Sequence, residues 1–64
     1  MVVIKGVVYT YEILDSTVIL TNYATNKETS TTLREFIKSI EKIPNVNSVI
    51  LNKMQKEYPE CFIN

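Results

Sequence analysis

The chain has 64 residues, and its seven basic and seven acidic side chains give a formal net charge of zero. This length allows one domain with a small core, and the neutral charge disfavours nonspecific binding to nucleic acid or to an anionic membrane. With one cysteine and no histidine, neither a disulfide nor a structural zinc site is expected to add stability, so oligomerisation is the device that remains.

The amino-terminal segment does not resemble a signal peptide. Residues 1–9, MVVIKGVVY, lack a cationic start followed by a long apolar run. No apolar stretch approaches the roughly 20 residues needed to cross a bilayer. We therefore expect a cytoplasmic protein with no membrane partner.

Before the first long strand, Gly6 separates residues 1–5 from the rest. We interpret this glycine as a candidate bulge or bend, so the first strand could begin nearer Val2.

Residues 7–14 and 17–23 predict a β-hairpin with apolar side chains on both faces. Both runs are rich in β-branched and aromatic residues, and Asp15 and Ser16 supply a short turn between them. A two-residue loop would pair Ile13 with Val18, Tyr11 with Leu20 and Tyr9 with Asn22. A slip of one residue would exchange the two faces. The face that we expect toward a helix holds Val7, Tyr9, Tyr11, Ile13, Val18 and Leu20.

The other face of the hairpin is the main functional clue. An apolar sheet face open to water is unfavourable, so either the chain's own tail or another molecule should cover it. The tail could do so through Tyr58, Phe62 and Ile63. A second copy of the chain or a different protein is the alternative, and the two readings are compatible. The candidate partner-binding residues are Val8, Leu14, Ile19 and Tyr23.

The segment after the hairpin predicts a turn, a short strand and a helix. Residues 24–27 form the turn, and residues 28–31 form a short polar strand suited to a sheet edge. Thr32 and Glu35 then have the spacing of a capping box, and Pro44 disfavours helical geometry beyond residue 43. The helix is expected at about residues 32–43, with an amphipathic stripe of Leu33, Phe36, Ile37, Ile40 and Ile43.

The carboxy-terminal third permits two interpretations. Residues 48–53 are predicted as a fourth strand, because Val49, Ile50 and Leu51 form a β-favouring run. A helix remains the alternative, since Val46, Val49, Ile50, Met54 and Tyr58 also fit a period of 3.6 residues. Residues 54–64 are a possible extended or partner-covering tail.

These elements predict one α+β domain over residues 1–64. A three-stranded antiparallel meander carries one amphipathic helix on one face, and the fourth strand completes the order β-β-β-α-β. The fourth strand would lie beside residues 7–14 through a right-handed crossover.

The residues that could carry chemistry are few. A single glycine excludes the P-loop and the dinucleotide-binding fingerprint, which need several. With no histidine and one cysteine, no nucleophile–base pair or metal cluster is evident. We expect no enzymatic activity, no cofactor and no metal.

Charge patterning offers an alternative to the apolar face. Arg34, Lys38 and Lys42 follow one another at intervals of four residues and form a basic row on the predicted helix. Such a row could bind phosphates or an acidic partner, which makes a small nucleic-acid-binding or transcription-regulating domain the alternative function. Glu35, Ser39 and Glu41 nearby dilute its field.

The function predicted first is a small non-enzymatic protein-interaction module that also forms a homodimer. Small size and a composition rich in Lys, Asn and Ile, typical of AT-rich coding sequences, favour a phage or mobile-element accessory protein that binds and inhibits a host factor.

Overall fold

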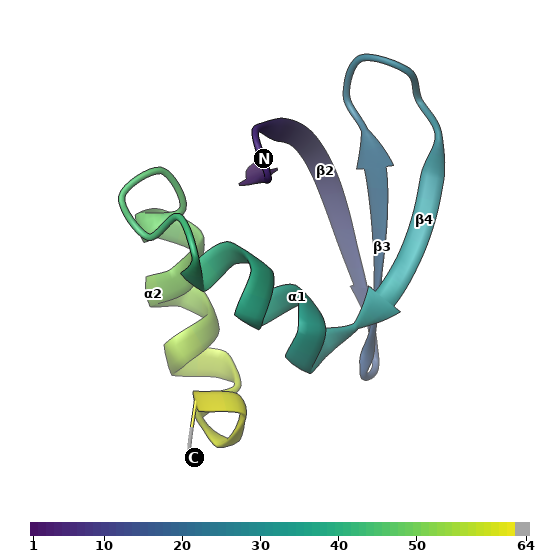
Figure 1. Ribbon diagram of the computed structural model, residues 1–64. Coiled ribbons are helices and arrows are strands. Elements are labelled where there is room, and N and C mark those ends of the chain that lie inside the picture. The colour runs from purple at the N-terminus through teal and green to yellow at the C-terminus, as the bar shows by residue number, and fades with distance from the viewer. Residues whose placement is uncertain (63–64) are drawn as a thin grey trace.

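A four-stranded antiparallel sheet forms one layer of the protein. The computed structural model describes residues 1–62 (Figure 1). The strands follow the chain in spatial order β1-β2-β3-β4, a continuous meander. This confirms the predicted α+β meander with a helix packed on it. The strands are β1 (Val2–Ile4), β2 (Val7–Leu14), β3 (Thr17–Asn22) and β4 (Glu28–Thr32).

The central hairpin has the predicted register. Leu14 pairs with Thr17, so Asp15 and Ser16 form a two-residue turn, and Tyr11 lies opposite Leu20. Asp15 has a positive φ of 57°, which aspartate tolerates better than most residues. The alternation of apolar side chains with a period of two residues therefore predicted correctly which residues of β2 and β3 share a face.

Residues 1–6 form a hairpin of their own with β2. Ile4 pairs with Val7, and both residues between them, Lys5 and Gly6, have positive φ values of 52° and 78°. Two positive φ values in a two-residue loop are typical of a type I′ turn, whose twist matches that of the strands. Gly6 is thus a turn residue rather than a bulge.

A five-residue loop joins β3 to β4, and hydrogen bonds of Asn22 hold it. The backbone N–H of Asn22 donates to the Lys27 carbonyl at 2.8 Å, and its side-chain oxygen accepts from the N–H groups of Ala24 and Thr25 at 2.9 and 3.1 Å. Asn26 has a positive φ of 61°, a conformation that asparagine adopts at low cost. After this loop, β4 lies at the edge of the sheet, as the polar composition of residues 28–31 predicts.

Helix α1 (Leu33–Glu41) begins where the capping pattern predicts. The Thr32 hydroxyl accepts from the Glu35 N–H at 3.1 Å, so one first-turn donor is satisfied. The buried side chains of α1 are Leu33, Phe36, Ile37 and Ile40, the first four members of the predicted stripe.

The predicted strand at residues 48–53 is wrong, because helix α2 (Ser48–Glu57) occupies this segment. The place beside β2 that this strand would have taken belongs to β1. Ile50, Leu51 and Met54 are buried at helical spacing, whereas Val49 is 84% exposed. The β-favouring run was misleading because burial against α1 outweighs the weak intrinsic preference of β-branched residues.

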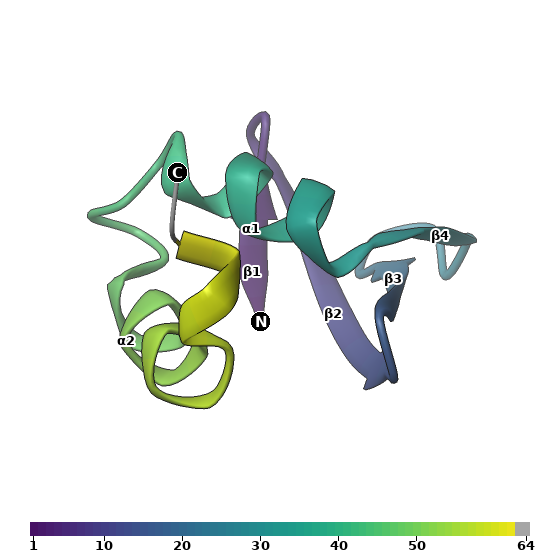
Figure 2. The ribbon, with the colours of Figure 1, turned by 90° about the horizontal axis from the view of Figure 1, so that it is seen from below.

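The carboxy-terminal segment is helical rather than extended. After α2, Pro59–Phe62 forms a single 3-10 turn, η1. Figure 2 shows α1 across one face of the sheet, with α2 and η1 packed beside it. All the described helical elements therefore lie on the same side of the sheet.

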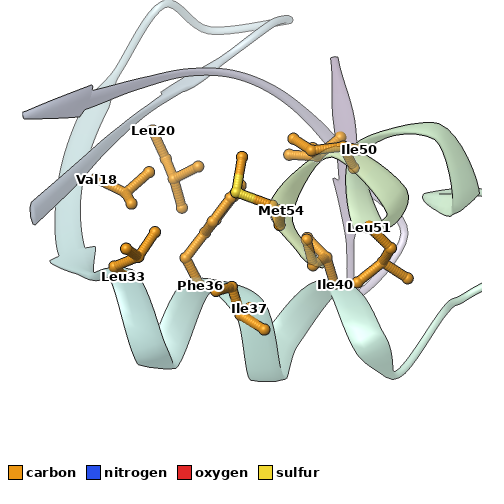
Figure 3. Packing of buried hydrophobic residues seen from close by; sticks show 10 residues of the cluster. Val18, Leu20, Leu33, Phe36, Ile37, Ile40, Ile50, Leu51 and Met54 are labelled. Carbon is orange, nitrogen blue, oxygen red and sulfur yellow. The ribbon is translucent and has the colours of Figure 1, made fainter. Parts of the chain in front are cut away.

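The core lies between the sheet and these helices. The Met54 side chain is fully buried and points between Leu20 of β3 and Phe36 of α1 (Figure 3). Tyr11 adds an aromatic contact, with its ring centroid 5.5 Å from that of Phe36. The buried apolar side chains are Val2, Val18, Leu20, Leu33, Phe36, Ile37, Ile40, Ile50, Leu51 and Met54.

Candidate functional site

Large apolar side chains lie exposed on the outer face of the sheet, opposite the helices. Val8 is 38% exposed, Leu14 48% and Tyr23 64%, while Ile19 is half-buried. On the helix side of the same hairpin, Val18 and Leu20 are 0% and 6% exposed. The sheet therefore keeps one covered and one open face.

The outer face carries two apolar clusters rather than one patch. Val8 and Tyr23 are cross-strand neighbours, since the Tyr23 N–H donates to the Val8 carbonyl at 3.0 Å. At the far end of β2, Leu14 lies diagonally from Ile19, whose direct partner is Glu12. The first cluster is Val8 and Tyr23, and the second is Leu14 and Ile19.

A polar row separates these clusters. Thr10 and Thr21 face each other between them on the same side of the sheet. A partner that touches both clusters must span the six residues from Val8 to Leu14, about 20 Å at the rise of a strand. This length suits a protein surface better than a small molecule.

The carboxy-terminal tail does not cover the outer face within the described part of the chain. Tyr58, Cys61 and Phe62 pack against the core cluster, on the helix side of the sheet. Of the two alternatives for covering the outer face, the one in which Tyr58 and Phe62 fold over Val8, Ile19 and Tyr23 is therefore excluded. Ile63, the third side chain named for that role, lies outside the described residues. The physical reason is that α2, absent from the predicted fold, directs the tail toward α1.

The three basic residues of α1 lie in different surroundings. Arg34 lines a cavity of about 390 Å³ together with the acidic residues Asp15 and Glu60. Lys38 is exposed near the middle of the helix. Lys42 lines a second hollow, of about 200 Å³, with Lys5. The row is therefore basic at its Lys42 end and mixed in charge at its Arg34 end.

The larger cavity lies where the β2–β3 turn, the start of α1 and η1 meet. Ser16, Tyr58 and Cys61 contribute to its wall beside the charged groups. Among residues 1–62, no cluster of three or more potential metal ligands occurs. The cavity holds hydroxyl, thiol and charged groups of both signs, which is a surface that water solvates well.

The tyrosines of β2 do not form a platform for nucleic-acid bases. Tyr9 and Tyr11 are half-buried and pack against the core. Base stacking requires an exposed aromatic face.

Two residues gain importance that the sequence reasoning did not assign. Lys5 joins Lys42 because the type I′ turn projects it beside the end of α1. Asn47 is 2% exposed, and its side-chain amide bonds to the backbone of Val3 and of Ile40. An asparagine just before the apolar run, in a chain rich in asparagine, carries no signal of such long-range contacts.

No protein-family model matches this chain, and no curated protein or solved structure matches it either. Within residues 1–62, no helix has the length and apolar character needed to cross a membrane.

Proposed function

We propose that this chain is a non-enzymatic protein-binding module that docks a protein partner on the outer face of its sheet. The observation that carries the proposal is the exposure of Val8, Leu14 and Tyr23 on one face of a rigid sheet. Exposed apolar side chains that share a face are typical of interaction surfaces.

The geometry of the two clusters supports a preformed docking surface. Val8, Leu14 and Ile19 project from paired strands, and Tyr23, directly after β3, is held by its backbone bond to Val8, so little conformational entropy is lost on binding. Tyr23 is suited to the centre of an interface, because an aromatic ring buries a large area while its hydroxyl keeps a hydrogen-bonding group. The threonines between the clusters supply polar contacts without charge.

A neutral chain with an open apolar face suits an accessory protein that acts by occupying the surface of another protein. The specific form that we propose is a phage or mobile-element protein that binds and inhibits a host factor. This form rests on small size and composition.

The test is a triple variant, Val8→Thr with Leu14→Thr and Tyr23→Thr. Threonine keeps the strand preference while it removes apolar area, so the fold should persist and partner capture should be lost. Affinity capture from the native host, followed by mass spectrometry, compares wild type, the triple variant and Val49→Thr.

Val49→Thr is the matched control, because Val49 is 84% exposed but belongs to α2. A partner retained by wild type and by the control, and lost by the triple variant, supports the proposal. Equal capture by all three proteins would contradict it. Circular dichroism and urea unfolding establish that each variant is folded.

Binding of nucleic acid through the basic row is the second candidate function. The proximity of Lys5 and Lys42 favours it, because these two basic residues line one hollow. Asp15 and Glu60 beside Arg34 oppose it. Tyr9 and Tyr11 are half-buried against the core, so they offer single-stranded nucleic acid no open stacking surface. We therefore rank it below the outer face.

A further inference from the structure

The two edges of the sheet differ in whether their backbone groups have partners. At the β1 edge, the Val3 N–H donates to the Asn47 side-chain oxygen at 3.0 Å, and the Asn47 amide N–H donates to the Val3 carbonyl at 2.9 Å. Asn47 thus binds Val3 as a neighbouring strand would. The β1 edge is closed by this contact.

The opposite edge is β4, and the described helices do not reach it. Figures 1 and 2 show α1 leaving the end of β4 toward β1, so that both helices lie away from the β4 edge. Glu28, Thr29 and Ser30 are exposed. Nothing in residues 1–62 is seen to lie along this edge in either view.

The hydrogen-bond pattern identifies the open backbone groups of β4. Asn22 and Lys27 form a hydrogen-bonded pair, with the Asn22 N–H donating to the Lys27 carbonyl at 2.8 Å. Such pairs alternate along an antiparallel ladder, so the next bonded residues of β4 are Thr29 and Thr31. The outward backbone groups are those of Glu28 and Ser30 and the N–H of Thr32. The Thr32 carbonyl lies at the N-cap of α1 and accepts from the first turn of the helix.

Apart from its shortness and one charge, this edge has none of the features with which proteins block unwanted strand pairing. Its sequence, ETSTT, contains no lysine and no proline, and its single charge lies at the first residue, Glu28. Residues 28–32 all pair with β3 without a bulge. An open edge of this kind is a template for another strand.

We propose that β4 pairs with β4 of a second copy of this chain, antiparallel, about a two-fold axis at Ser30. The pairing places Ser30 opposite Ser30 and Thr29 opposite Thr31, hydroxyl-bearing pairs that are favourable across strands. Glu28 faces Thr32, so no like charges meet. The two Ser30 residues then exchange two hydrogen bonds, and the Thr32 N–H of each copy donates to the Glu28 carbonyl of the other copy.

The strand's own complementarity is the reason for a second copy as partner. Paired in reverse against itself, the sequence ETSTT places no like charges opposite each other. The zero net charge of the chain adds no repulsion between copies. A two-fold axis normal to the sheet is an isologous arrangement, the commonest in homodimers.

The dimer has a geometric consequence for the outer face. With the two-fold axis normal to the sheet, the helices of both copies lie on one side and the two outer faces lie on the other. The two four-stranded sheets then form one continuous sheet. The proposed partner surface would be present twice, side by side.

Amide hydrogen exchange measured by NMR at low and high protein concentration tests the pairing. Thr29 and Thr31 should exchange slowly at all concentrations, because they bond to β3. The amides of Ser30 and Thr32 should exchange rapidly in dilute solution, where the chain is a monomer. Their exchange should become slow at the concentrations at which sedimentation shows the mass rising toward that of a dimer. A chain that stays monomeric, or a dimer in which Ser30 still exchanges rapidly, would overturn the proposal.

A charge placed at the axis provides the variant test. Ser30→Lys brings two ammonium groups opposite each other without changing the backbone, so the dimer should be lost at low salt and recovered at high salt. Asn45→Lys, at an exposed loop position, adds the same charge and should leave the dimer intact. A Ser30→Lys variant as dimeric as wild type at low salt would contradict pairing at β4.

The edge and the outer face are separable in the same experiments. The Val8, Leu14 and Tyr23 triple variant should remain a dimer, because none of these residues belongs to β4. Loss of the dimer in that variant would show assembly through the outer face and overturn the edge proposal. Protection of Ser30 that arises only with a different protein would overturn the assignment to a second copy.

Discussion

Asn47 links three parts of the molecule that are distant in sequence. Its side-chain oxygen accepts from Val3, and its amide donates to the carbonyls of Val3 and Ile40, at 2.9 and 3.2 Å. Its backbone carbonyl accepts from the Leu51 N–H at 2.9 Å in the first turn of α2. One buried side chain therefore joins β1, the end of α1 and the start of α2. Among residues 1–62, every buried side-chain polar atom has a partner, as a small core requires.

Replacing Asn47 with alanine should destabilise the fold strongly. The change removes three hydrogen bonds and leaves the Val3 backbone groups unpaired, with an expected loss of about 2–4 kcal/mol in the free energy of unfolding. Urea denaturation measures the loss, and exchange of the Val3 amide should accelerate. Asn45→Ala, at an exposed position, is the control and should change stability by less than about 0.5 kcal/mol. Similar losses in both variants would show that Asn47 does not join these elements.

Among the secondary-structure elements, those whose first residue is marked by a sequence signal were the easiest to predict. The helix α1 was predictable because the Thr32 cap marks its start and its apolar stripe is regular. Helix α2 was not, because its N-cap residue, Asn47, makes no side-chain capping bond. In addition, Val49, Ile50 and Leu51 favour a strand locally. Tertiary burial of Ile50, Leu51 and Met54 decides the conformation.

Truncating a side chain should lower the stability strongly on the buried face of α2 and hardly at all on its exposed face. Met54→Ala leaves a cavity between the sheet and α1, and the free energy of unfolding should fall by about 2–5 kcal/mol. Val49→Ala removes an exposed side chain and improves helix propensity, so stability should change by less than about 0.5 kcal/mol. Thermal and urea unfolding of both variants measure the contrast. In a strand, Val49 and Leu51 would share a face, so a large loss at Val49 would contradict the helix.

At the scale of the whole molecule, the protein is a two-layer slab with dimensions of 33 × 26 × 16 Å. The helices cover one face of the sheet, and the other face has no cover from residues 1–62. With zero net charge, binding at this face should depend on apolar area rather than on a long-range field.

Salt dependence should separate the two candidate functions. Partner binding through the outer face should change little as salt rises, because Val8, Leu14 and Tyr23 carry no charge. Binding of nucleic acid through three basic contacts should weaken, with a slope of about −2.7 in log affinity against log salt on duplex DNA. Titrations with the captured partner and with duplex DNA measure both. The triple variant Arg34→Ala with Lys38→Ala and Lys42→Ala tests this contact. If its affinity for DNA is unchanged, the basic row is excluded as the DNA-binding surface.

The hairpin, its register, the polar edge strand and the first helix could all be predicted from the amino-acid sequence. Each of these depends on neighbours in the chain: a period of two residues, a two-residue turn, or a cap with its stripe. The candidate residues of the outer face follow from the same period, so they too were available from sequence. Their exposure was not, because it depends on where the tail goes.

The conformation of residues 48–57, the place of β1 and the path of the tail depend on long-range packing. Val49, Ile50 and Leu51 favour a strand locally, but the segment is a helix because α1 provides a surface for Ile50, Leu51 and Met54. Once α2 packs there, Asn47 reaches Val3 and closes the β1 edge, and Tyr58 and Phe62 turn toward the core. The open outer face is a consequence of this long-range packing, which no local pattern encodes.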